Sequence, residues 1–278
     1  MTPPDAALLE AVRRGDAKAL ETLLERHAPA VHRFARTLCR HPEDAEEVLQ
    51  ETLLAAARNL DRFREEASVS TWLFTIARRA CMRLARRRAG EPEHFAPLDD
   101  APLAAASDDP QAHAERDEAR RRLYAALHAL SPSHREVILL RDIEERPAAE
   151  VAAILGIEVG AVKSRLHRAR ARLRAILRAD ASLPPPSPDG GCFEVEEALS
   201  RMVEGDLPKP ACDRLSAHVD ACPRCKARCD TLGAILSACH DLAAEPTPPS
   251  VRRVVTDTAR RALVELAAPS APNPRGDE

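Results

Sequence analysis

The sequence predicts an all-α protein made of small helical domains. Aromatic residues make up only 3% of the chain and there are nine glycines, whereas apolar residues reach 45%. The cores must therefore be built from Ala, Leu, Val and Ile, and the abundance of Ala, Leu, Arg and Glu favours helices over strands. Apolar side chains also recur at the three- and four-residue spacing of an amphipathic helix. A chain of 278 residues is long enough for two or three such domains.

The first predicted domain covers residues 5–90. Apolar spacing indicates helices on both sides of a break at Gly15-Asp16, and a further helix begins after Pro42 with carboxylates in its first turns, where the helix dipole favours them. Residues 59–70 indicate a loop, and a basic helix follows. We predict that four large side chains of this domain belong to its core, with base stacking as the alternative for the second and third: Phe34, Trp72, Phe74 and Ile76.

Residues 91–114 predict a mobile acidic linker, because they are rich in Pro, Ala and Asp and have no sustained period. The negative charge of this linker would keep the basic surfaces on either side of it apart. A passive tether is the alternative.

The second predicted domain covers residues 115–180 and contains a short apolar helix, a tight turn and a long basic helix. Pro147 suits the first position of the short helix, and Gly156 ends it by adopting a left-handed backbone. The long helix turns Val162, Leu166, Ala169 and Leu173 inward. Basic residues spread over the rest of its surface: Lys163, Arg165, Arg168, Arg170, Arg172 and Arg174. Such a helix can lie in a DNA major groove, with its first residues against base edges and the others on phosphates.

The segments SPSHREVILLR and AAEVAAILGIEVGAVKSRLHRAR in this domain resemble region 4 of the extracytoplasmic-function (ECF) sigma factors, a branch of the sigma-70 family. The resemblance runs from about residue 127 to residue 173. It implies that the second helix of the pair reads the −35 promoter element. The implied DNA-binding residues are Lys163, Ser164, Arg165, His167 and Arg168.

The segments DAEEVLQETLLAA and LDRFREEASVSTWLFTIARR resemble region 2 of the same family, over residues 8–88. This resemblance implies that the acidic helix docks on core RNA polymerase through Asp44, Glu47, Gln50 and Glu51. It also implies that the loop and the basic helix melt and capture the −10 element, because an extruded base needs a pocket and the freed strand needs cations. The pocket candidates are Phe63, Arg64 and Ser70, and the strand candidates are Arg78, Arg79, Arg83 and Arg86.

A Pro-rich linker, residues 181–189, precedes a Cys-rich third domain, residues 190–240. Cys222 is predicted to be the N-cap of a helix that Pro223 begins, with Cys225 in its first turn and His218 at the end of the preceding helix. Cys192 can reach the same corner and complete a tetrahedral Cys₃His set, a closed geometry suited to structural Zn²⁺. Unligated cysteines in a small helical core are the alternative.

The pattern C…HxxxCxxC from Cys192 to Cys225 resembles the zinc-binding anti-sigma domain, which usually belongs to a separate protein that clasps a sigma factor. It also resembles the Cys-rich tail of metal-responsive, CorE-like ECF factors. Three further thiols exceed the need of one zinc and form a second or alternative candidate set: Cys212, Cys229 and Cys239. Sulfur and imidazole donors favour Zn²⁺, Cd²⁺ or Cu(I) over Mg²⁺ or Ca²⁺.

Residues 241–278 contain an amphipathic stretch, VRRVVTDTARRALVELAA. We expect either a helix that docks on the sigma domains or a frayed terminal helix. Cys39 and Cys81, in the first domain, lie on apolar helical faces and are predicted to be inert buried thiols.

The resulting hypothesis is an ECF sigma factor that binds core RNA polymerase and promoter DNA, and whose own C-terminal domain controls its activity through metal occupancy. An autonomous helix-turn-helix regulator with a structural zinc domain is the alternative, and a redox switch that ejects zinc through Cys222 and Cys225 is the alternative for the tail. The sequence has no phosphate loop, catalytic triad or open zinc site, so no enzyme is expected. We expect a cytoplasmic protein without membrane contact, because no apolar run approaches ~20 residues and no signal peptide is evident.

Overall fold

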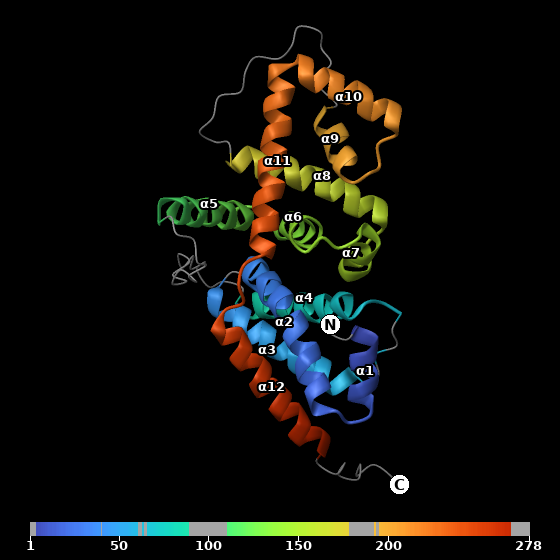
Figure 1. Cartoon of the computed structure of the whole chain (residues 1–278), viewed down its shortest axis with the longest axis vertical. Coiled ribbons are helices and arrows are strands. Elements are labelled where there is room, and N and C mark those ends of the chain that lie inside the picture. Colours follow the sequence, from blue (N-terminus) through green and yellow to red (C-terminus); the bar gives the residue numbers. More distant parts are fainter. Residues whose placement is uncertain are drawn as a thin grey trace. The chain divides into compact units, whose positions relative to one another are not determined.

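The computed structural model describes residues 4–39, 41–60, 63, 66–88, 110–177, 192 and 195–267. These residues form helices and short connections, and no strand occurs in the described ranges, so the predicted all-α fold is confirmed (Figure 1). None of the described helices combines the length and apolarity needed to span a bilayer. The chain separates into two compact units, of which the first joins residues 1–94 with residues 247–278 and the second covers residues 95–246.

The first unit is a helical bundle with local caps that follow from its sequence. Asp16 accepts hydrogen bonds from the backbone N–H groups of Lys18 and Ala19 at one helix start, and Ser68 accepts one from Thr71 at another. The helices are α1 (Asp5–Arg13), α2 (Ala17–Leu38), α3 (Pro42–Asn59), α4 (Val69–Arg87) and α12 (Pro249–Ala267).

Phe34 and Phe74 form the centre of this bundle, with ring centroids 5.3 Å apart and both side chains essentially inaccessible. Both are therefore core residues, as predicted. Trp72 and Ile76 are only half-buried, so the prediction that these two side chains lie in the core was too strong. They lie four residues apart, on one side of α4, and neither is among the buried residues of that helix.

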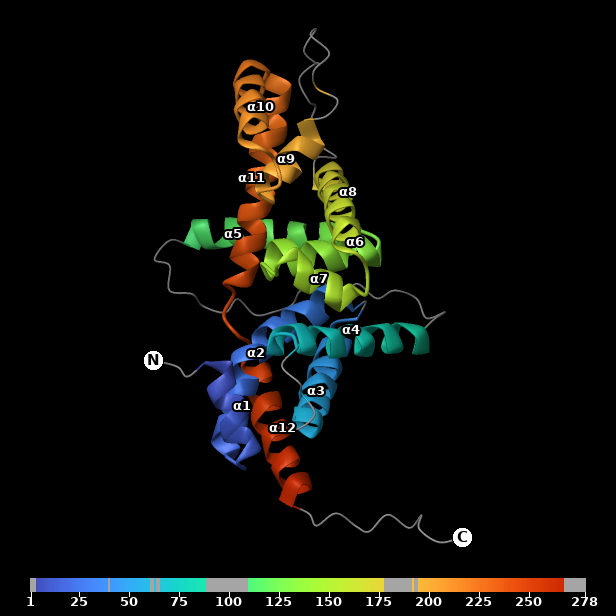
Figure 2. The same ribbon diagram turned by 90° about the vertical axis from the view of Figure 1, so that its right-hand side faces the viewer.

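Helix α12 packs along α2 and α3, although these two helices lie far from it in the sequence (Figures 1 and 2). Val251, Val255, Ala259 and Ala262 recur at three- and four-residue spacing and are all buried. The amphipathic stretch predicted in residues 241–278 thus forms a docked helix rather than a frayed one. The apolar spacing predicted this row of residues, but the sequence could not indicate which helices bury it.

The second unit contains α5 (Pro110–His128), α6 (Pro132–Ile138), the π-helical segment η2 (Leu139–Ile143), α7 (Ala148–Leu155), α8 (Val159–Leu177), α9 (Val195–Val203), α10 (Lys209–Ala221) and α11 (Pro223–Ala243). Since α5 begins at Pro110, the last five residues of the predicted linker 91–114 are helical. Residues 91–109 and the predicted linker 181–189 lie outside the described ranges.

Helices α7 and α8 form the predicted helix-turn-helix. Gly156 has φ 67°, and the N–H of Ile157 reaches back to the carbonyl of Ala152, which caps α7 with the left-handed residue that glycine tolerates best. Pro147 is the N-cap of α7 rather than its first helical residue. The four apolar residues predicted to face inward on α8 are completely buried: Val162, Leu166, Ala169 and Leu173.

Helices α9, α10 and α11 share a small core of Val195, Leu199, Leu215, Val219 and Leu232, together with three cysteines. Gly205 has φ 72° and closes α9, because the N–H of Asp206 donates to the carbonyl of Arg201. Helix α11 also extends onto α5, α8 and η2. The Cys-rich segment therefore packs against the helix-turn-helix domain within one compact unit.

Candidate nucleic-acid interface and metal centre

The predicted DNA-binding residues of α8 divide between two sides of the helix. Ser164 and Arg168 are exposed, and the Ser164 hydroxyl donates to the carbonyl of Gly160. Arg165 and His167 are half-buried. Lys163 Nζ lies 2.7 Å from a carboxylate oxygen of Asp206, in the connection between α9 and α10. One side of α8 thus faces solvent while the other faces the Cys-rich segment.

Two basic residues of α8 are buried, which corrects the expectation that all its cations spread over an open surface. Arg170 Nε donates to Asp142 Oδ2 at 2.9 Å, and its Nη2 lies 2.9 Å from Glu204 Oε1. Arg174 lies 3.6 Å from Glu196 Oε2. These pairs explain the burial, since a guanidinium is rarely taken out of water without a partner.

Glu204 joins a second arginine to this network. Both Arg141 of η2 and Arg170 of α8 donate to its side chain, which is almost fully buried. Burial raises the pKa of Asp142, and the arginine hydrogen bond opposes that rise. The network therefore fixes the end of α9 on the helix-turn-helix domain through charges that have little contact with water.

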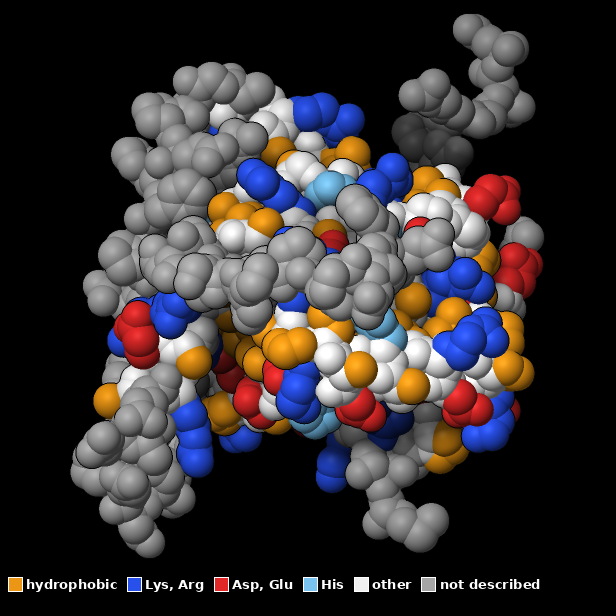
Figure 3. Space-filling view, turned by 90° about the horizontal axis from the view of Figure 1, so that it is seen from above, with side chains coloured by type: hydrophobic (Ala, Val, Ile, Leu, Met, Phe, Trp, Pro, Cys, Tyr) orange, Lys and Arg blue, Asp and Glu red, His pale blue; other side chains and the backbone are white. Residues whose placement is uncertain are grey.

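Sequence reasoning missed Glu196, Glu204 and Asp206 as functional residues. The signal in the sequence was the density of acidic residues in the short segment FEVEEALSRMVEGD. This segment follows a helix whose row of cations has no acidic partners of its own. On the described part of the face in Figure 3, Lys and Arg side chains are scattered among apolar and acidic ones rather than gathered in one broad field.

The predicted polymerase-binding residues of α3 are partly engaged by α4. Asp44 is buried, with its carboxylate 2.8 Å from Arg88. Glu47 lies 3.8 Å from Arg87, and Glu51 pairs with Arg83, one of the predicted strand-binding cations. Gln50 is half-buried, whereas Arg79 and Arg86 are exposed and Arg78 is half-buried. The acidic face of α3 and the basic face of α4 therefore neutralise one another in part.

Of the three predicted −10 pocket residues, the structure describes two. The ring of Phe63 packs on Trp72 with centroids 4.9 Å apart, and its carbonyl accepts a hydrogen bond from Arg13 at 2.9 Å. Ser70 is buried in the first turn of α4, with its hydroxyl 3.0 Å from that of Ser68. Arg64 lies outside the described residues.

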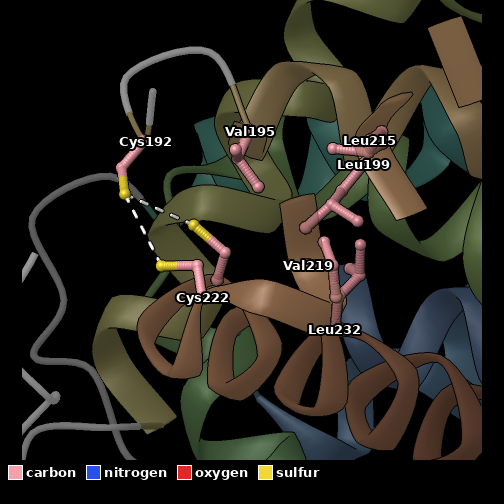
Figure 4. Close-up of a cluster of buried hydrophobic side chains, with 8 residues drawn as sticks. Cys192, Val195, Leu199, Leu215, Val219, Cys222 and Leu232 are labelled. Carbon is pink, nitrogen blue, oxygen red and sulfur yellow. Dashed lines mark hydrogen bonds between the residues drawn. The ribbon is translucent and has the colours of Figure 1, made fainter. Parts of the chain in front are cut away.

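Cys192, His218, Cys222 and Cys225 converge at one corner of the Cys-rich segment, with all ligand atoms within 4.8 Å of one another. Figure 4 labels two of them, Cys192 and Cys222, whose sulfurs point toward one another. The Cys192 sulfur is 3.9 Å from that of Cys222 and 3.6 Å from that of Cys225, and His218 Nε2 is 3.3 Å from Cys225 Sγ. The predicted capping geometry is present, because Cys222 is the N-cap of α11.

These distances fit a tetrahedral metal ion. With metal–sulfur bonds of about 2.3 Å, the sulfur–sulfur edges of a tetrahedron are about 3.8 Å. Burial raises the pKa of the Cys225 thiol to about 12, and the Cys192 and Cys222 sulfurs reinforce the rise, while the backbone N–H of Cys225 lowers the pKa of Cys222. A bound cation would stabilise the thiolate form of the three cysteines and the neutral imidazole of His218.

The remaining cysteines do not join this cluster. Cys212 Sγ donates to the carbonyl of Leu207 at 3.4 Å, Cys229 is half-buried against the small core, and Cys239 is inaccessible. Burial raises the pKa of Cys239 far above its usual value. Cys39 and Cys81 are buried in the first unit, where their sulfurs lie 2.9 Å apart.

Comparison with known proteins matches three family models along the chain. "Sigma-70 region 2" matches residues 23–91, "Sigma-70, region 4" matches residues 120–173, and "Putative zinc-finger" matches residues 192–226.

Named relatives agree with these matches. The ECF RNA polymerase sigma factor SigM of Mycobacterium tuberculosis is 40% identical over 174 residues, which cover 62% of this chain and 84% of SigM. RNA polymerase sigma factor CarQ of Myxococcus xanthus is 36% identical over 171 residues, which cover 61% of this chain and 95% of CarQ. A solved structure of CnrH in complex with the cytosolic domain of CnrY is similar at 31% identity and a TM-score of 0.48, over 64% of this chain and 99% of that one.

Proposed function

Because the chain belongs to the ECF sigma factors, which direct RNA polymerase to promoters and are not enzymes, we propose that its own C-terminal zinc-binding domain restrains that activity. The match to region 2 argues against the alternative of an autonomous helix-turn-helix regulator. The observation that carries the proposal is the packing of α9 and the connection after it on α8, because Asp206 and Glu204 of that connection engage Lys163 and Arg170 of the expected −35 helix.

The second support is the division of the C-terminal segment between the two sigma regions. Helices α9 to α11 pack on region 4, and α12 packs on α2 and α3 of region 2. Helix α3 carries the residues implied in docking on core polymerase. This division supports the proposal, because a segment that covers parts of both regions would compete with polymerase and with promoter DNA.

Zinc would stabilise the docked form. The closed Cys₃His set suits structural Zn²⁺, and a small domain of this kind obtains folding free energy on the order of 10 kcal/mol from the metal. Loss of zinc would unfold α9 to α11 and release region 4. Cd²⁺ and Cu(I) prefer the same donors and would compete as signals.

The test compares full-length Cys222→Ser with Cys212→Ser as matched control, after both are purified with zinc. We expect Cys222→Ser to bind core RNA polymerase more tightly in a pull-down and to start more transcripts from a genomic promoter library, while Cys212→Ser behaves like the wild type. Equal binding and equal transcription by all three proteins would refute metal-dependent restraint. Loss of transcription only in Cys222→Ser would make the domain an activator.

A further inference from the structure

One side of α8 carries a row of cations that pair with acids of the C-terminal domain. Lys163, Arg170 and Arg174 follow one another at seven- and four-residue spacing, which keeps them on one face of a helix. Their partners are Asp206 at 2.7 Å, Glu204 at 2.9 Å and Glu196 at 3.6 Å, respectively. We call these three pairs the α8 ladder.

The middle rung differs from the other two. Arg170 also holds Asp142 of region 4 and the hydroxyl of Ser200, and its side chain is 3% exposed. Removing one partner from such a buried pair is strongly destabilising. The central rung therefore sets the register of α9 on α8.

The Lys163–Asp206 pair is wetter and so easier to exchange, since the Lys163 side chain is 41% exposed and that of Asp206 is 30% exposed. Exposed pairs of this kind contribute little stability, and salt screens them. In the third pair Glu196 is 33% exposed and also lies 3.4 Å from Arg228, whereas Arg174 is only 5% exposed. A polyanion could therefore take over Lys163 at small cost, and it would reach the buried Arg174 only once Glu196 has moved away.

A DNA phosphate offers these cations the same interaction as the two carboxylates. Both are anionic oxygen acceptors that form charge-assisted hydrogen bonds with Lys and Arg. Lys163 lies in the first turns of α8, the part of a recognition helix that approaches DNA most closely. Asp206 lies at this N-terminal part of α8, because the left-handed residue Gly205 reverses the chain just before it.

We propose that Glu196 and Asp206 are phosphate mimics, and that the ligand competing with them for α8 is the phosphate backbone of duplex DNA. The inference deepens the proposed function and depends on it, because α8 must be a DNA-binding helix. Docking of α9 and binding of DNA to α8 are then mutually exclusive, and each weakens the other by the same factor.

The experiment measures binding of a fluorescein-labelled, mixed-sequence DNA duplex to the full-length, zinc-loaded protein by anisotropy at several salt concentrations. The test variant is Glu196→Gln/Asp206→Asn. The control is Glu197→Gln/Asp220→Asn, which removes the same formal charge from exposed positions of the same domain. We expect about fivefold tighter binding by the test variant than by the control, since the carboxylates that occupy Lys163 and Arg174 are lost.

We also expect the logarithm of affinity to fall more steeply with the logarithm of salt concentration in the test variant, because more cations of α8 reach phosphates. Equal affinities of test and control variants would overturn the inference, since only net charge would then matter. Asp206→Asn alone provides a milder second variant. Its circular dichroism melt, which we expect to match that of the wild type, checks that the domain remains folded.

Arg168→Ala, introduced into the test variant, distinguishes a failure of this inference from a failure of the premise that α8 binds DNA. Arg168 is exposed and stands outside the α8 ladder. If the test variant gains affinity and Arg168→Ala removes the gain, α8 binds DNA and the mimic is supported. If Arg168→Ala weakens DNA binding but the test variant gained nothing, only the mimic fails. If Arg168→Ala has no effect, the DNA-binding role of α8 fails as well.

Discussion

At the scale of single residues, the chemistry of each cysteine follows from its surroundings. Cys192, Cys222 and Cys225 share one corner with His218, whereas Cys239 lies on the buried side of α11, where burial raises the pKa of its thiol strongly. The sequence predicted the four-residue set because the caps of α10 and α11 are local features. It left Cys212, Cys229 and Cys239 open, because thiols one turn apart on a helix can point either into a site or away from it.

Cys225→Ser should lose the bound metal, whereas Cys229→Ser, one helical turn later, should keep it. Serine is a poor zinc ligand, so three donors would remain in the first variant and four in the second. Metal content per chain and the thermal melt of the full-length protein are the measurements. A full equivalent of zinc in Cys225→Ser would contradict the ligand assignment.

Cys239 should react with iodoacetamide much more slowly than Cys212 in the folded protein. The thiolate is the reactive form, and Cys239 combines a strongly raised pKa with complete burial, whereas Cys212 is half-buried. Mass spectrometry of peptides from timed, quenched samples measures the two rates. Comparable rates would show that α11 separates from η2 frequently under native conditions.

At the scale of elements, local rules predicted α7 and α8 well, and long-range pairing explains the errors. Gly156 and the inward residues of α8 could be predicted because helix caps and apolar spacing depend only on residues that are close together in the sequence. The burial of Arg170 could not, since its partner Glu204 is 34 residues away and on another helix. Asp44 was likewise expected on an open face, yet Arg88 of the following helix end covers it.

Gly205→Ala should lower the free energy of unfolding of the second unit by about 1 kcal/mol, because an L-residue pays a steric penalty at positive φ. No atom lies within 4 Å of the added Cβ, so crowding contributes nothing. Gly233→Ala, in the interior of α11, is the matched control and should stabilise instead. Urea unfolding of both variants gives the comparison. A neutral Gly205→Ala would mean that the turn between α9 and α10 relaxes readily.

At the scale of the whole molecule, the described helices from residue 195 onward pack against two different partners. Residues 195–243 pack with region 4, and α12 packs with region 2, although α11 and α12 are close neighbours in sequence. The sequence predicted a third domain and a tail, because composition changes abruptly at the Pro-rich linker. It could not predict which surfaces those parts cover, since the complementary apolar stripes and charges lie in distant helices.

The docking of α12 gives the last prediction. Val255 is buried between α12 and the helices α2 and α3, so Val255→Glu would place an unpaired carboxylate in an apolar contact at a cost of about 3 kcal/mol. Val264, at 67% exposure on the same helix, provides the control Val264→Glu with an identical change of charge. We expect the first variant to release α12 and therefore to become more sensitive to trypsin at Arg260 and Arg261. It should also bind core RNA polymerase more tightly in a pull-down, because α3 would be uncovered. Release of α12 without any change in polymerase binding would show that α12 covers a face of region 2 that polymerase does not use.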